Sequence, residues 1–134
     1  MSISPTDVSE YDAITEIVQH YIDSARSGSG GDMKAAFHED ATIFGYAGDY
    51  LFAGPIQQLF DWNDGNGPAA GLRARIASID LIDTAATVRL ELENWTGHRF
   101  TDLFTLLKFD GKWKITNKVF HLHDEDMIAV SETT

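Results

Sequence analysis

The sequence predicts an α+β domain, a cone-shaped, curved antiparallel sheet wrapped around three N-terminal helices. Two observations support this fold class. Three runs of alternating β-branched and aromatic residues, 84–95, 98–109 and 112–123, are separated by tight turns that end in Gly97 and Gly111. Helical periodicity is confined to the first half of the chain, so helices and the long strands are segregated along the sequence.

A long N-terminal helix is expected to begin at Ser4, the predicted N-cap, with Pro5 in its first turn and Asp7 three residues after the cap. The glycine-rich stretch 27–31 should end this helix. Its apolar side chains recur at the three- and four-residue spacings of one helix face: Tyr11, Ile14, Val18, Tyr21, Ile22 and Ala25.

The segment that follows is expected to contain a short helix, a hairpin and a third helix. Asp32 is the predicted cap of the short helix 33–37. Residues 42–46 and 49–53 are the predicted strands of the hairpin. Pro55 is expected at the first position of the third helix, before the loop 64–68. The buried side of that helix should carry Ile56, Leu59, Phe60 and Trp62.

A fourth long strand, 72–82, is predicted to precede the three runs. Its alternation breaks between Ile76 and Ile79, where a bulge would curve the sheet. Nothing resembles a linker, so residues 1–134 are expected to form a single domain with a core at about 9–123 and a tail at 124–134. Helices over a curved sheet leave a cone whose wide end is the natural place for a pocket.

Composition narrows the possible partners. The net charge of −11 disfavours nucleic acids and anionic membrane surfaces, because phosphates are bound by Lys and Arg. The absence of cysteine excludes disulfides, thiolate metal sites and cysteine nucleophiles. Nucleotide-binding motifs are missing, and no cofactor is expected. The N-terminus lacks the features of a signal peptide, which predicts a cytoplasmic protein.

Two motifs connect this order of elements with a known group. They are Phe37 to Thr42 (FHEDAT), after the short helix, and Phe109 to Ile115 (FDGKWKI), near the end. With them the chain resembles the nuclear transport factor 2-like superfamily over about residues 9–123. That group includes ketosteroid isomerases, scytalone dehydratase and polyketide cyclases. The segment 106–121 is most similar to its "putative lumazine-binding" subgroup. The resemblance implies the cone fold, which hosts enzymes and binding proteins alike.

The resemblance does not extend to the isomerase mechanism. Ketosteroid isomerases place a carboxylate base a few residues beyond the Asp-Ala-Thr motif, where this chain has Phe44, Gly45 and Tyr46. Their oxyanion-hole acid corresponds to Thr105, and Tyr21 could correspond to their oxyanion tyrosine. Proton abstraction needs a base as well as donors for the enolate, and the base is missing here.

Asp102 and Lys118 are the strongest candidates for chemistry. Asp102 shares a strand side with Phe100 and Phe104, and Lys118 shares one with Phe120. A carboxylate and an amine on adjacent strands, each among apolar neighbours, could form a pair at the floor of the pocket, where burial would shift both pKa values. The same pair could instead be a structural salt bridge.

His121 is the third catalytic candidate. His121 and His123 point to the same side of a strand and precede acidic residues 124–126. A closed metal site needs three or four convergent ligands, and the acids lie in the expected tail, so no metal site is predicted. His98 is expected at the surface, after the turn.

The direction in which strand 84–95 faces stays open at this stage. Val88, Leu90 and Leu92 alternate with a second set of residues, Arg89, Glu91, Glu93 and Trp95. Simple amphipathicity places the aliphatic set against the helices and exposes the charges. Alignment of the turn after Trp95 with the isomerases suggests the opposite, with the Arg89 side toward the pocket.

The leading functional hypothesis is a protein that binds a small apolar or aromatic molecule in the cone. The alternatives are an isomerase, dehydratase or cyclase that uses Asp102 or a histidine as acid or base, and a scaffold without ligand. Apolar residues on both sheet faces predict a homodimer through the outer face. The predicted ligand-binding residues are Tyr21, Phe37, Phe44, Tyr46, Tyr50, Trp62, Trp95, Asp102, Lys118 and Phe120.

Overall fold

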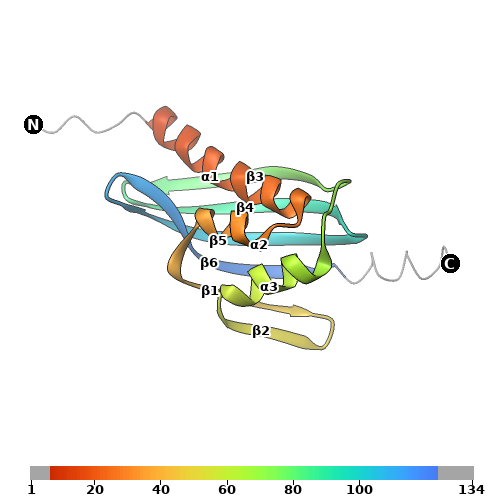
Figure 1. The fold of residues 1–134 in the computed structure, drawn as a ribbon. Coiled ribbons are helices and arrows are strands. Elements are labelled where there is room, and N and C mark those ends of the chain that lie inside the picture. Colours follow the sequence, from red (N-terminus) through yellow and green to blue (C-terminus); the bar gives the residue numbers. More distant parts are fainter. Residues whose placement is uncertain (1–6, 124–134) are drawn as a thin grey trace, which may run out of the picture.

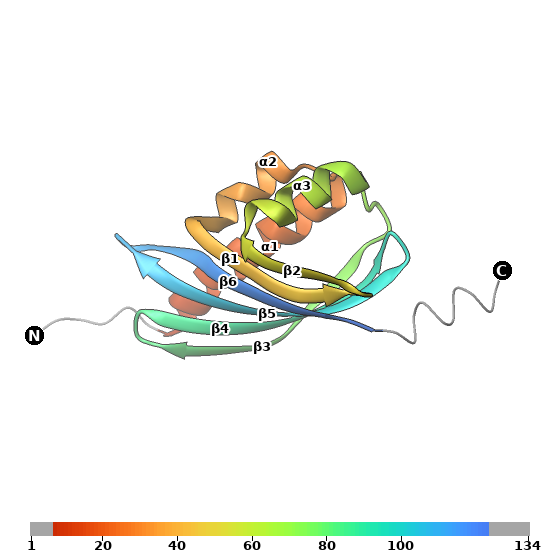
Figure 2. The same ribbon diagram turned by 90° about the horizontal axis from the view of Figure 1, so that it is seen from below.

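The computed structural model describes residues 7–123 and has the predicted α+β architecture (Figure 1). Within these residues, helices α1, α2 and α3 lie on one side of a bent sheet of six strands, as Figure 2 shows. The helical elements are α1 Asp7–Ser27, α2 Gly30–Met33, the 3-10 turn η1 Lys34–Ala36 and α3 Gln57–Asn66. The strands are β1 Phe37–Ala47, β2 Tyr50–Pro55, β3 Arg73–Ile82, β4 Ala85–Trp95, β5 His98–Phe109 and β6 Lys112–Leu122.

The strand order is β2-β1-β6-β5-β4-β3. All neighbouring strands are antiparallel except β1 and β6, which pair in parallel with Ile43 opposite Lys118. This pairing joins the N-terminal hairpin to the last strand of the meander. The sequence did not predict it, because strand patterns identify local hairpins but not partners far apart in the chain.

The three-stranded meander is confirmed almost to the residue. Both of its hairpins turn on two residues with positive φ: Thr96 (50°) with Gly97 (93°), and Asp110 (49°) with Gly111 (81°). Two consecutive residues with φ above zero form the type I′ turn that matches the twist of the flanking strands. Glycine at the second position therefore fixes both turns.

The predicted starts of the shorter helices are wrong. Ser29 caps α2, since its hydroxyl accepts a hydrogen bond from the Asp32 backbone N–H at 3.1 Å, so Asp32 lies inside the helix. Pro55 ends β2, and α3 follows Ile56. Serine is as good a cap as aspartate and stands earlier in the chain. The Ser4 cap predicted for α1 lies outside the described residues.

Two irregularities bend the sheet. The predicted bulge in β3 is confirmed between Ile76 and Ser78. A second one lies in β4 between Leu92 and Trp95, where Asn94 has a φ of 58°. It reverses the facing of the last residues of β4, so Trp95 is buried although simple alternation groups it with Arg89 and the two glutamates of the strand.

The facing of the rest of β4 is now settled. Val88, Leu90 and Leu92 are buried in the core between sheet and helices. Arg89 and Glu91 lie on the outer face, where they form an ion pair at 2.8 Å. Amphipathicity gave the right answer, and the alignment to the isomerases was misleading for Arg89. Within residues 7–123, no helix is both long enough and apolar enough to cross a membrane.

Candidate functional site

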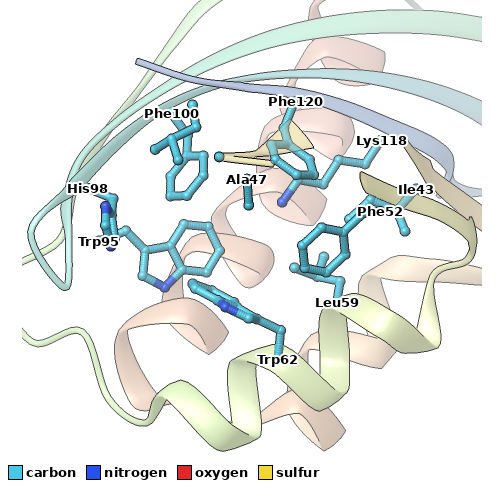
Figure 3. A pocket seen from close by; sticks show the side chains of 12 residues that line it. Ile43, Ala47, Phe52, Leu59, Trp62, Trp95, His98, Phe100, Lys118 and Phe120 are labelled. Carbon is cyan, nitrogen blue, oxygen red and sulfur yellow. The ribbon is translucent and has the colours of Figure 1, made fainter. Parts of the chain in front are cut away.

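A pocket of about 250 Å³ opens between the sheet and α3 (Figure 3). Leu59 and Trp62 of α3 form one wall, and strand residues form the others. Lys118 is the only Lys or Arg among the lining residues. Nearly all the other lining side chains are apolar. The lining comprises Ile43, Ala47, Gly48, Phe52, Leu59, Trp62, Trp95, His98, Phe100, Lys118, Phe120 and Leu122.

The walls of the pocket are held by edge-to-face aromatic contacts. Trp95 contacts Trp62 at 5.4 Å and Phe100 at 5.8 Å between ring centroids. Phe120 continues the chain of contacts to Phe100 at 5.8 Å and to Phe52 at 5.6 Å. Each such pair contributes about 0.5–1.5 kcal/mol beyond the burial of its area. The pocket is therefore a preformed aromatic site.

Lys118, Tyr21 and Asp102 form a buried hydrogen-bonded chain beside this pocket. The Lys118 ammonium Nζ donates to the Tyr21 hydroxyl at 2.8 Å, and this hydroxyl donates to Asp102 Oδ2 at 3.0 Å. Nζ is 3.6 Å from Oδ2, beyond a good direct hydrogen bond. The tyrosine hydroxyl therefore bridges the two charged groups.

The three residues meet because of strand register and one helix face. On the inner face of β5 and β6, Asp102 pairs with Phe120 and Phe104 pairs with Lys118, so the aspartate and the lysine are diagonal neighbours. Tyr21 reaches between them from the buried face of α1, with its ring 5.1 Å from that of Phe104. The helix thus adds the central member of the chain of hydrogen bonds.

Burial dominates the electrostatics of this cluster. Loss of hydration raises the pKa of Asp102 and lowers the pKa of Lys118, although their mutual attraction opposes both shifts. Burial, followed by the charge of Asp102, raises the pKa of the Tyr21 hydroxyl well above its usual value. Both charged groups are thus shifted toward their neutral forms, which suits a site that moves protons.

Some polar capacity in the cluster is unused. Asp102 Oδ1 is buried and, within residues 7–123, has no hydrogen-bond partner. The Lys118 Nζ lies against aromatic rings, 5.3 Å from the centroids of Tyr21 and Trp95 and 5.4 Å from that of Phe120. Such faces stabilise an ammonium group, but they offer it no proton acceptor. Asp102 Oδ1 therefore has the capacity to accept a further hydrogen bond.

The structure brings together most of the residues predicted to bind a ligand. Trp62, Trp95, Lys118 and Phe120 line the pocket. Tyr21 and Asp102 lie behind Lys118, where solvent does not reach them. Phe37 packs deeper in the core, with its ring 5.9 Å from that of Tyr21, and does not line the pocket.

Four predicted site residues lie elsewhere. Phe44, Tyr46 and His121 lie together on the outer face of the sheet, and Tyr50 is exposed on β2. The prediction for Phe44 and Tyr46 missed the parity of β1, in which Ala41, Ile43, Gly45 and Ala47 face inward. Gly45 carries the signal: a Cβ there would lie 2.6 Å from the Phe120 ring, so its side of β1 faces the pocket.

The sequence also missed pocket residues, above all His98. It was expected at the surface, yet it lines the pocket, and its Nδ1 is buried without a partner in the described part of the chain. Figure 3 places it across the pocket from Lys118. Strand alternation could have predicted this position, because His98, Phe100 and Asp102 are alternate residues of β5 and share its inner side. The other pocket residues outside the predicted ligand-binding set are Ile43, Ala47, Gly48, Phe52, Leu59, Phe100 and Leu122.

Residues 7–123 hold no group of three or more His, Asp or Glu side chains arranged to bind a metal ion. His121 and His123 are in contact, with ring centroids 4.8 Å apart, but no third potential ligand among these residues joins them. The acidic residues 124–126 that follow lie outside the described residues.

The fold and the inner pocket define a nuclear transport factor 2-like protein. Residues 9–121 match the family model described as "Putative lumazine-binding", and the chain belongs to this family. Two solved structures of NTF2-like proteins of unknown function are similar. The protein from Methylobacillus flagellatus KT is 56% identical (TM-score 0.86, 92% of this chain and 98% of that one). The protein from Shewanella baltica OS155 is 42% identical (TM-score 0.85, 90% and 98%).

A relative with an assigned activity also matches. The chain is 35% identical over 114 residues to a protein named aldolase FrzH from a Cladobotryum species, covering 84% of this chain and 91% of that protein. A solved structure described as "Putative Scytalone Dehydratase" from Novosphingobium aromaticivorans DSM 12444 is 19% identical (TM-score 0.67, 88% of this chain and 87% of that one), and this likeness shows the fold alone.

Proposed function

We propose that this protein binds a small, mostly apolar carbonyl compound in the inner pocket and catalyses an aldol-type reaction on it. One observation carries the proposal: a buried lysine lines an aromatic pocket and is connected through a tyrosine hydroxyl to a buried carboxylate. The similarity to a protein named as an aldolase supports the same reaction class.

The pocket sets the class of ligand. A dry cavity of about 150 Å³ holds benzene, so a pocket of about 250 Å³ has room for one or two rings. Aromatic walls favour a planar or cyclic apolar body. Lys118 offers a donor to a single polar group, and a carbonyl oxygen is an acceptor of the right kind.

An aldol reaction needs a proton to leave the carbon next to a carbonyl and another proton to reach the new alkoxide. Donors and acceptors close to the carbonyl accelerate both transfers. Asp102 does not line the pocket, whereas Lys118 does. Lys118 is therefore the group that meets the ligand: its neutral amine takes the carbon-bound proton. The ammonium then passes a proton through Tyr21 to Asp102, and the same path returns it for transfer to the new alkoxide. This modifies the expectation that Asp102 itself contacts the substrate.

Proton exchange tests the proposal without knowledge of the natural substrate. 2-Acetylnaphthalene is incubated with the protein in D₂O, and loss of its methyl signal is followed by proton NMR. We expect wild type to accelerate this exchange and Asp102→Asn to reduce it about a hundredfold or more, the lower end of the range for one general acid–base group. Asp80→Asn, which changes an exposed carboxylate on β3 outside the pocket, is the matched control and should exchange like wild type.

Two results would contradict the proposal. One is wild-type exchange no faster than that with buffer alone, for a ketone that binds. The other is equal exchange in wild type and Asp102→Asn. Binding is followed separately by the fluorescence of Trp62 and Trp95, which line the pocket. This measurement distinguishes a protein that binds the ketone without catalysing exchange from a protein that does not bind it.

We also propose that two copies associate through the outer face of the sheet. Strand pairing places Phe44, Val119 and Leu103 in one row across β1, β6 and β5, with 46%, 42% and 51% of their surface exposed. Arg89 pairs with Leu103 in the next strand and forms an ion pair with Glu91, so this face carries both charges that a self-complementary contact needs. Sedimentation should give a dimer for wild type and a monomer for Leu103→Asp. A monomeric wild type would end this proposal.

A further inference from the structure

We propose that Lys118 is a nucleophile that forms a covalent imine with the carbonyl carbon of its ligand. The inference deepens the proposed function and rests on it, since it needs a carbonyl compound in the inner pocket. The proposed function requires only that Lys118 hydrogen-bonds the carbonyl, so the two claims can fail separately.

The placement of the lysine supports this role. Lys118 lines the pocket and is 3% exposed. Its Nζ donates to the Tyr21 hydroxyl and lies 5.3 Å from the ring centroids of Tyr21 and Trp95 and 5.4 Å from that of Phe120. A carbonyl compound that fills the apolar pocket therefore brings its carbon next to an amine that is shielded from water. Water exclusion favours the imine, because water is the product of its formation and the reagent of its hydrolysis.

The amine must first lose a proton, since an ammonium group has no free electron pair. The cluster offers a path: Lys118 donates to the Tyr21 hydroxyl, which donates to Asp102. A proton passed along this path leaves Lys–NH₂ and Asp–COOH, a neutral pair that tolerates burial better than two ions. The lowered pKa of Lys118 and the raised pKa of Asp102, both caused by burial, favour the same neutral pair.

The reaction balances without any further reagent. The lone pair of Nζ forms a bond to the carbonyl carbon, and the carbonyl π electrons move to oxygen, which takes a proton from the Tyr21–Asp102 pair. The nitrogen, now positively charged, returns one proton to Asp102 through Tyr21. Loss of water from this carbinolamine gives the imine. The net change is R–CHO + H₂N–Lys → R–CH=N–Lys + H₂O. A protonated imine withdraws electrons from the neighbouring carbon more strongly than the carbonyl does, and so it acidifies the proton that an aldol reaction removes.

The other lysines provide an internal reference. Lys108 pairs with Glu10 at 2.7 Å, and Lys114 donates to the Ala35 carbonyl at 2.6 Å. Lys112 is exposed beside the last hairpin turn, and Lys34 is exposed in η1. None of these residues lines the inner pocket. Labelling at Lys112 therefore reports the reactivity of a solvated amine in the same molecule.

The test uses 2-naphthaldehyde, which has two rings and an aldehyde, with sodium cyanoborohydride at neutral pH. The hydride reduces an imine to a stable secondary amine, which mass spectrometry counts on the intact protein and peptide mapping locates. We expect one adduct at Lys118, formed at least about tenfold faster than at Lys112, because the pocket holds the aldehyde next to this amine. An excess of 2-methylnaphthalene, which has no carbonyl, should block the adduct at Lys118 and leave that at Lys112 unchanged.

Two variants complete the experiment. Lys118→Arg keeps the positive charge and removes the nucleophile, so the fast adduct should disappear, whereas Lys112→Arg should keep it. If Lys118→Arg does not fold, the comparison of Lys118 with Lys112 in wild type still decides. Quenching of Trp62 and Trp95 by 2-methylnaphthalene without preferential labelling of Lys118 would overturn the imine and leave the binding proposal intact. No quenching and no preferential labelling would overturn both, and labelling without ketone exchange would overturn the aldol-type activity alone.

Discussion

Each face of the sheet carries an ion pair between a basic side chain and a carboxylate, and the two pairs differ in separation and in burial. Arg89 and Glu91 on the outer face are 2.8 Å apart, with 55% and 36% of their side chains exposed. Lys118 and Asp102 on the inner face are 3.6 Å apart and almost fully buried. The shorter contact is the weaker one, because water screens it and can solvate either partner alone.

The comparison shows that the face, rather than the residue type, decides how a carboxyl group behaves. A hydrogen bond from Thr101, with help from Arg89, lowers the pKa of Glu91. Burial raises the pKa of Asp102 despite its lysine partner. A buried pair is rarely the most stable way to fill a core, since apolar residues of similar volume often serve as well or better. We infer that the inner pair exists for its chemistry.

The largest expected difference between the faces comes from removing one carboxylate. Asp102→Ala leaves Lys118 buried without its partner and should lower the free energy of unfolding by about 3–5 kcal/mol. Glu91→Ala exposes Arg89 to water and should lower it by no more than about 1 kcal/mol. Urea unfolding of both variants measures the two values. Similar losses would mean that the inner pair is more hydrated than its burial indicates.

Replacing both inner partners sharpens this comparison. The double variant Asp102→Leu with Lys118→Met should recover most of the stability lost in Asp102→Ala, because no unpaired charge remains. It should nevertheless give no preferential labelling by the aldehyde. Recovery of stability with loss of reactivity would separate the chemical role of the pair from its structural role. A double variant as unstable as Asp102→Ala would show that the pair itself supports the fold.

The apolar residues of the two faces give the next largest contrast. Leu90→Ala removes a side chain with no exposed surface and should reduce stability by about 2–5 kcal/mol. Leu103→Ala, on the neighbouring strand but 51% exposed, should stay within about 0.5 kcal/mol of wild type in a monomer. Thermal unfolding at several protein concentrations checks both. A concentration-dependent loss in Leu103→Ala would be the signature of the proposed dimer.

Loss of a bridging hydroxyl should have a smaller effect. Tyr21→Phe removes the group that connects Lys118 and Asp102 and should reduce stability by about 1–3 kcal/mol, since it leaves buried partners unsatisfied. Thr101→Ser on the outer face is the control, because its hydroxyl can still donate to Glu91. Tyr21→Phe should also slow labelling of Lys118. Unchanged labelling would show that protons reach the amine by another route.

The smallest expected effect is a difference in pH dependence. The pKa of Glu91 is lowered by folding, so its contribution to stability is present above about pH 4 and is lost as pH falls through the folded-state pKa. The pKa of Asp102 is raised, so wild type should lose stability relative to Asp102→Asn as pH rises from about 4 through the folded-state pKa. Urea unfolding of Glu91→Gln and Asp102→Asn across this range should give slopes of opposite sign relative to wild type. Parallel slopes would place both carboxyl groups in similar surroundings.

The sequence alone determined the elements and much of the inner face. Residue alternation and two glycine turns located β4, β5 and β6, since a strand's periodicity and a turn's need for positive φ are local properties. The same alternation identified one carboxylate, Asp102, and one amine, Lys118, that each lie among aromatic neighbours on a strand. It also gave the correct facing of Leu90 through simple amphipathicity.

Only the tertiary structure decided which residues meet. The parallel pairing of β1 with β6 sent Phe44 and Tyr46 to the outer face, and the bulge at Asn94 turned Trp95 into the pocket. Packing of α1 on the sheet placed the Tyr21 hydroxyl between Lys118 and Asp102. These contacts join residues far apart in the chain, and they depend on strand register and helix packing, which no local pattern specifies. The sequence therefore identified several residues of the inner face, but only the tertiary fold determined which of them are in contact.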